Sequence, residues 1–102
     1  DLLSTATALL VQSGRFFRLE DAFASVGRDH GDNLDLLRSA PDHAALFDLR
    51  DLPGPLAALV GQRTERNVAE VKRLVIRYSR FEEVERDRVC LKQPDEVREQ
   101  WR

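Results

Sequence analysis

The strongest hydrophobic pattern in the chain lies between residues 66 and 80. Its apolar side chains recur at helical spacing and, at about 100° per residue, fall within an arc of roughly 120°. Asn67 followed three residues later by Glu70 is a variant of the capping box that opens many helices. The pattern predicts an amphipathic helix that depends on packing, because its β-branched residues weaken intrinsic helicity. The apolar positions are Val68, Val71, Leu74, Val75 and Tyr78.

Two short runs with alternating side chains follow this helix. They cover residues 81–85 and 88–92, and they flank a turn at Arg86 and Asp87. The pattern predicts a β-hairpin, and the helix before it predicts a recognition helix followed by a wing. Pro94 then opens a last helix over residues 94–102.

The first half of the chain reads mainly as helices. Apolar spacing and glycine stops predict helices over 1–13, 19–26 and 34–40, the third capped by Asp32 or Asn33. An extended piece over 15–19 and a strand over 44–49 lie between and after them. Pro53-Gly54-Pro55 is the sharpest break, and it precedes a short helix over 55–60. We therefore expect an α+β fold, a mostly helical winged-helix-like domain with a C-terminal β-hairpin wing and a final helix.

The length of the chain fits one domain over residues 1–102, with 1–52 and 55–92 as its two halves. Hydrophobic residues make up 42% and charged residues 33%, which is typical of a globular domain with a charged surface. The net charge of −2 is unevenly distributed. Residues 53–102 contain eleven basic and nine acidic side chains, so a basic patch exists on a slightly acidic domain.

The polar face of the principal helix carries most of that basic patch. Four arginines fall within an arc of roughly 60° opposite the apolar arc, and guanidinium groups in a row suit phosphate oxygens. Glu82, Glu83 and Glu85 on the expected hairpin would oppose a phosphate backbone, so a solvated face laced with ion pairs is the alternative. The predicted nucleic-acid-binding residues are Arg66, Lys72, Arg73, Arg77, Arg80, Arg86 and Arg88.

A second cluster of candidate contacts is the run Arg15-Phe16-Phe17-Arg18. Adjacent aromatic side chains with basic neighbours can stack on nucleic-acid bases. The interpretation we favour is structural, with one phenylalanine in the core and the other covering an edge.

The first half also resembles the OST-HTH/LOTUS type of winged helix. The resemblance rests on residues 9–19, on the segment Leu36-Leu37-Arg38-Ser39-Ala40-Pro41-Asp42, and on Leu46-Phe47-Asp48-Leu49. The loop at 28–33 departs from that family, being shorter and lacking its Gly-Phe element. The resemblance implies a partner class of structured or single-stranded RNA, or the core of a DEAD-box helicase, and carries over no functional residues.

These observations favour a non-enzymatic module that binds nucleic acid, RNA more than DNA. A protein-interaction domain in a larger RNA-processing or regulatory assembly is the alternative, with an aromatic such as Phe16 or Trp101 as anchor. No catalytic constellation or phosphate-binding loop is present in the sequence, so we expect no reaction and no cofactor. His30 and His43 are isolated, so we expect no metal.

The cellular location is inferred from the lengths of the apolar runs and from the single cysteine. No apolar run reaches the ~20 residues that a membrane span requires, so we expect no membrane contact. Cys90 is alone and lies in an apolar strand, which predicts a buried structural thiol and a reducing compartment. We expect an intracellular protein, cytoplasmic or nuclear.

Overall fold

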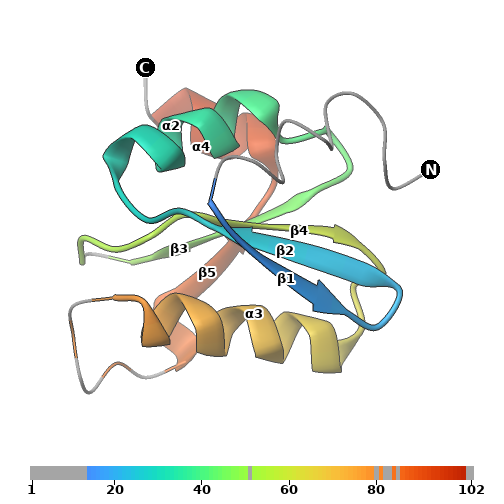
Figure 1. The fold of residues 1–102 in the computed structure, drawn as a ribbon. Coiled ribbons are helices and arrows are strands. Elements are labelled where there is room, and N and C mark those ends of the chain that lie inside the picture. Colours follow the sequence, from blue (N-terminus) through green and yellow to red (C-terminus); the bar gives the residue numbers. More distant parts are fainter. Residues whose placement is uncertain (1–13, 51, 80, 82–83, 85, 101–102) are drawn as a thin grey trace.

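The computed structural model describes residues 14–50, 52–79, 81, 84 and 86–100, with the backbone alone at 86 and 100. Its centre is a five-stranded sheet in the order β1-β2-β4-β3-β5 (Figure 1). Every neighbouring pair of strands is antiparallel. The strands are β1 (Arg15–Leu19), β2 (Ala22–Val26), β3 (Ala45–Leu49), β4 (Ala57–Gly61) and β5 (Val89–Lys92).

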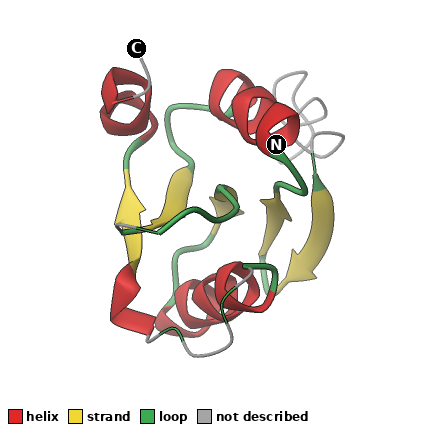
Figure 2. Ribbon diagram, turned by 90° about the vertical axis from the view of Figure 1, so that its left-hand side faces the viewer, coloured by secondary structure: helices red, strands yellow, loops and turns green. Residues whose placement is uncertain are grey.

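Helices cover both faces of this sheet. Helices α2 (His30–Ser39) and α4 (Pro94–Gln100) lie together on one face, and α3 (Glu65–Arg77) lies on the other (Figures 1 and 2). A single 3-10 turn, η1 (Arg86–Arg88), leads into β5. The sheet is thus the middle layer of three, and β1 and β5 are its two edges.

The three central strands are buried on both sides. On β4, Ala57 and Leu59 pack in the cluster beneath α3, while Ala58 and Val60 pack in the cluster beneath α2 and α4. On β3, Phe47 and Leu46 divide in the same way. Almost every residue of β2, β3 and β4 is buried, and full burial of one large apolar side chain contributes about 1.5–3 kcal/mol.

Local polar contacts fix where the elements begin. The Asp29 side chain caps α2 by accepting from the backbone N–H of Asp32 at 2.8 Å. Gly61 ends β4 with a φ of +116°, and a Cβ there would lie 2.5 Å from the carbonyl oxygen of Asp21. Only glycine permits this close approach to the turn between β1 and β2.

The expected winged helix is wrong, because the fold is a five-stranded antiparallel sheet with three described α-helices. The helix expected over 19–26 is a β-turn and β2, and the helix expected over 55–60 is mostly β4. The strand residues of both segments are mainly apolar and lack regular alternation, because both faces of each strand are buried. Such runs do not distinguish a buried strand from a buried helix.

The expected C-terminal hairpin is also wrong. Residues 86–88 form η1, and β5 pairs with β3, placing Val89 opposite Leu49 and Leu91 opposite Phe47. The two N-caps were misplaced as well. Thr64 caps α3, where Asn67 lies inside the helix, and α2 begins at His30, before both Asp32 and Asn33.

Several expectations are confirmed. The extended piece at 15–19 is β1, the strand at 44–49 is β3 without its first residue, and the principal helix and the helix opened by Pro94 exist as α3 and α4. The expected helix over 1–13 lies outside the described residues.

Candidate nucleic-acid interface

Helix α3 presents the two faces that its sequence predicts. Val71, Leu74 and Val75 are buried against the sheet, and the predicted apolar face is confirmed. Arg66, Arg73 and Arg77 are exposed, and Lys72 is half-buried. The helix thus holds three of the candidate arginines at the surface because its opposite side is fixed in the core.

Edge strand β1 brings a further arginine, Arg15, to the end of this helix. The guanidinium of Arg15 lies 4.4 Å from the centre of the Tyr78 ring, and that of Arg77 lies 5.7 Å from it. Phe17 of β1 contacts the same ring with a centroid distance of 5.9 Å. Tyr78, which ends α3, therefore connects an arginine of the strand with an arginine of the helix.

Two hollows lie between β1 and α3, with volumes of about 250 and 370 Å³. Their linings share Arg18, Leu19 and Glu70, so the two hollows lie side by side, and together they are here called the β1–α3 groove. The basic residues that line it come from both elements. They are Arg18, Arg66, Arg73 and Arg77.

Two carboxylates offset part of the positive charge. Arg73 donates from Nε and Nη2 to the two carboxylate oxygens of Glu70. This pairing raises the pKa of Arg73 above its ordinary value. Glu20 lies 3.7 Å from Arg66, although both side chains are largely exposed. Exposed pairs of this kind contribute little to stability and exchange readily for other partners.

The other arginines in the groove, and Arg15 beside it, are less constrained. Among the residues that the structure describes, Arg15, Arg18 and Arg77 form no ion pair. Arg15 still acts at a distance, since its charge helps to lower the pKa of Asp32, after the larger effect of Arg28. The groove therefore keeps guanidinium groups available to an anionic ligand.

Not all predicted site residues meet at this groove. Arg88 is exposed in η1, next to edge strand β5, and β5 and β1 are opposite edges of the sheet. The side chain of Arg86 and all of Arg80 lie outside the described part, as do Glu82, Glu83 and Glu85. Within the described part of the chain, Glu20 and Glu70 are the acids that pair with arginines of the groove.

Sequence reasoning missed β1 as part of the candidate interface. The signal was the run Arg15-Phe16-Phe17-Arg18, which we interpreted as structural. That interpretation holds for packing, since Phe17 contacts the core and Phe16 contacts Phe23 at the edge of the sheet. It overlooked the flanking arginines, which the strand order brings next to α3.

Other kinds of site receive no support from the described residues. They contain no group of three or more His, Cys, Asp or Glu side chains placed to hold a metal ion. In the part of the chain with assigned structure, no helix has the length and apolar character needed to cross a membrane. Cys90 is half-buried, where we expected full burial, and its sulfur lies 4.0 Å from the carbonyl oxygen of Arg88.

Comparison with protein families gives a match to the NFACT protein RNA binding domain over residues 14–101, which is most of the chain. The chain belongs to this family. No curated protein and no solved structure shows significant similarity to it.

Membership of the NFACT RNA-binding family agrees with the nucleic-acid class expected from the sequence and with RNA in particular. The family is described by binding and not by a reaction, in line with a non-enzymatic module. It does not support the resemblance to OST-HTH/LOTUS domains, whose winged-helix fold the structure also contradicts.

Proposed function

We propose that this domain binds RNA along the β1–α3 groove, with Arg15, Arg18, Arg66, Arg73 and Arg77 contacting phosphates. The observation that carries the proposal is the convergence of arginines from two elements, one edge strand and one helix, on a single depression. Guanidinium groups donate several N–H bonds in a planar fork that matches phosphate oxygens.

Aromatic side chains beside the arginines favour a single-stranded ligand. Phe17 and Tyr78 line the groove, and Phe16 of the same edge strand is 45% exposed. Unpaired bases stack on such rings without requiring a particular sequence. A duplex keeps its bases paired and stacked and so offers these rings no free base, which makes single-stranded RNA the expected form.

The carboxylates within the groove set the character of the binding. A phosphate that reaches Arg73 or Arg66 must compete with Glu70 or Glu20 for the guanidinium. We therefore expect moderate affinity that depends steeply on salt, since contact with phosphates releases counterions.

A salt titration tests this proposal. For single-stranded RNA, the logarithm of the binding constant should fall with the logarithm of salt concentration at a slope of up to about −3.5, if five phosphates are contacted. Replacing both Arg18 and Arg77 with alanine should reduce the steepness by about 1.4. Binding that stays flat with salt, or that is absent at low salt, would contradict the proposal.

Two further arginine variants locate the surface. Arg38→Ala is the control, because Arg38 is exposed on α2, across the sheet from α3. It should leave the slope unchanged. Arg88→Ala asks whether the contact extends to the β5 edge, as the sequence suggested. A reduced slope would widen the surface to that edge, whereas an unchanged slope confines it to the groove.

A protein partner is the second candidate function. It is favoured by the exposed apolar side chains on the two sheet edges, Phe16 on β1 and Leu91 on β5. Edge strands pair readily with another chain. Capture of partners from extract before and after nuclease treatment separates the two candidates, because partners held through RNA are lost and direct protein partners remain.

A further inference from the structure

A second depression adjoins the β1–α3 groove and is not part of it. Its volume is about 340 Å³, and it is lined by the segment after β2, by residues 53–55 ahead of β4, and by the residues that follow α3. Tyr78 lines both this depression and the groove. A strand lying in the groove therefore passes the opening of the depression at Tyr78.

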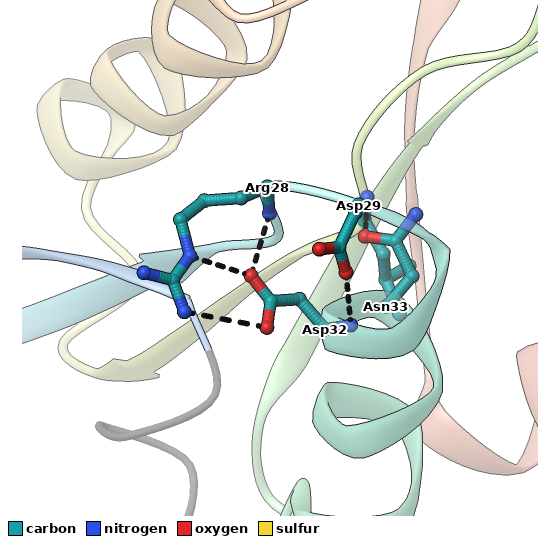
Figure 3. Close-up of polar contacts among 5 residues, drawn as sticks. Arg28, Asp29, Asp32 and Asn33 are labelled. Carbon is teal, nitrogen blue, oxygen red and sulfur yellow. Dashed lines mark hydrogen bonds and ion pairs between the residues drawn. The ribbon is translucent and has the colours of Figure 1, made fainter.

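The charges in the depression argue against a phosphate. Arg28 lines it, but Asp32 holds the guanidinium at 2.7 Å from Nε and also accepts from the Arg28 backbone N–H at 2.9 Å (Figure 3). These contacts lower the pKa of Asp32 and keep its carboxylate charged. Asp29 lines the depression itself, whereas Asp32 acts on it only through Arg28. The charge of Arg28 is thus engaged by Asp32, and the Asp29 carboxylate at the lining disfavours a phosphate.

The lining of the depression suits a neutral ring. Pro53, Pro55 and Tyr78 supply apolar surfaces, and His30 supplies a further ring at the start of α2. Pockets for small ligands have volumes of roughly 300 Å³ or more and are lined by apolar and aromatic side chains with a few polar groups. Unpaired bases of RNA are recognised in just this manner, turned out of the strand and stacked on rings.

We infer that this depression, here called the base pocket, takes one unpaired base of an RNA strand whose phosphates lie in the β1–α3 groove. The inference rests on the proposed function and adds the form in which the ligand is recognised. Asp29 uses one carboxylate oxygen to cap α2 and retains further acceptor capacity. A base with an exocyclic amino group, adenine, cytosine or guanine, should therefore bind better than uracil.

The test compares two versions of one single-stranded RNA about ten nucleotides long, one with its bases and one with abasic sugars throughout. Both versions carry the same phosphates. For the protein without substitutions, removal of the bases should reduce the affinity for RNA by about 5- to 100-fold. Replacement of every base with uracil should give an intermediate affinity.

Two histidine variants assign the loss to the base pocket. His30→Ala should weaken binding of the base-containing RNA and leave the abasic RNA unaffected. His43→Ala is the matched control, since His43 is likewise exposed but lies in the turn between α2 and β3 and does not line the pocket. Pro53→Ala, at another exposed lining position, serves as a second pocket variant, and thermal unfolding checks that all variants are folded.

The possible failures are distinguishable. If both RNAs bind equally and with a steep salt dependence, the base pocket is overturned while phosphate binding in the groove stands. The same conclusion follows if His30→Ala and Pro53→Ala behave like His43→Ala. If neither RNA binds at low salt, the proposed function fails, and the base pocket fails with it.

Discussion

The guanidinium carbon of Arg15 lies 4.4 Å from the centre of the Tyr78 ring, which is closer than the guanidinium of Arg77 at 5.7 Å. This contact joins the first residue of the edge strand to the residue that ends α3. A guanidinium stacked on a ring keeps its N–H groups at the edge of the stack, where a phosphate can still accept from them. The contact therefore orders Arg15 without occupying its donors.

Removing the ring at Tyr78 should weaken RNA binding. Tyr78→Leu keeps an apolar side chain beside Phe17 but removes the face on which Arg15 rests. We expect affinity to fall by roughly fivefold and the free energy of unfolding to fall by about 0.5–1 kcal/mol. Anisotropy of labelled RNA and urea denaturation measure the two effects. Tyr78→Phe is the matched control, and it should retain most of the affinity. An equal loss in both variants would assign the effect to the hydroxyl group.

Neutralising Glu70 should strengthen RNA binding. Glu70 pairs with Arg73 inside the groove, and Glu70→Gln removes the charge that competes with phosphate for this guanidinium. The expected gain in affinity is roughly two- to fivefold at low salt. Arg73→Ala should have the opposite effect. Glu65→Gln removes an exposed acid from the first turn of the same helix, outside the groove, and should change affinity little. A gain in affinity of similar size with Glu65→Gln would show that the effect comes from the net charge of the domain and not from the release of Arg73.

Helix α3 could be predicted from the sequence because one of its faces is buried and the other is not. Val71, Leu74 and Val75 recur at helical spacing for that reason, and the pattern required no knowledge of neighbouring elements. Strands β2 and β4 gave no such signal. Helices on both sides of the sheet bury Phe23 and Ala24 alike, so these strands show no alternation of apolar and polar residues. The glycines at the ends of the two apolar runs, Gly27 and Gly61, then resembled the residues that end helices.

The candidate site was predictable only in part, and for a related reason. The arginines of α3 follow from the helix alone. Arg15 and Arg18 join them only because β1 is the edge strand beside α3, which depends on the strand order of the whole sheet. The pairing of β5 with β3, in place of a local hairpin, is likewise a contact between segments far apart in the chain. Local patterns do not encode such pairings.

Asn67 should anchor α3, so replacing it should lower the free energy of unfolding more than removing the helix cap at Thr64 does. Its buried side-chain amide donates to the carbonyl oxygens of Glu20 at 2.8 Å and Gln62 at 2.9 Å, tying α3 to the turn between β1 and β2. Asn67→Asp removes both donors and places a carboxylate against two carbonyls. We expect a loss of about 2–4 kcal/mol in the free energy of unfolding.

Two further variants serve as comparisons for Asn67→Asp, one at the same residue and one at the N-cap residue, Thr64. Asn67→Ala removes the donors without adding charge and should cost less than Asn67→Asp. Thr64→Ala removes the side-chain oxygen that accepts from the Asn67 N–H at 3.0 Å, and should cost about 1 kcal/mol. Urea denaturation ranks the three. If Thr64→Ala proved the most damaging, the anchoring role of Asn67 would be refuted.

The ion pair between Arg28 and Asp32 should make stability depend on acid pH. Hydrogen bonding to Arg28 lowers the pKa of Asp32 in the folded protein. A carboxyl group with a lowered folded-state pKa contributes stability above its unfolded pKa of about 3.9, and that contribution is lost as pH falls through the folded-state pKa. Asp32→Asn should therefore be less stable than the natural protein at about pH 7, and the two should converge at about pH 2. Asp35→Asn, on the exposed side of the same helix and with no bond to Arg28, should track the natural protein throughout. Thermal unfolding as a function of pH measures the stability of all three proteins. If the difference between Asp32→Asn and the natural protein stayed constant down to the lowest pH, the charge of Asp32 would not stabilise the fold.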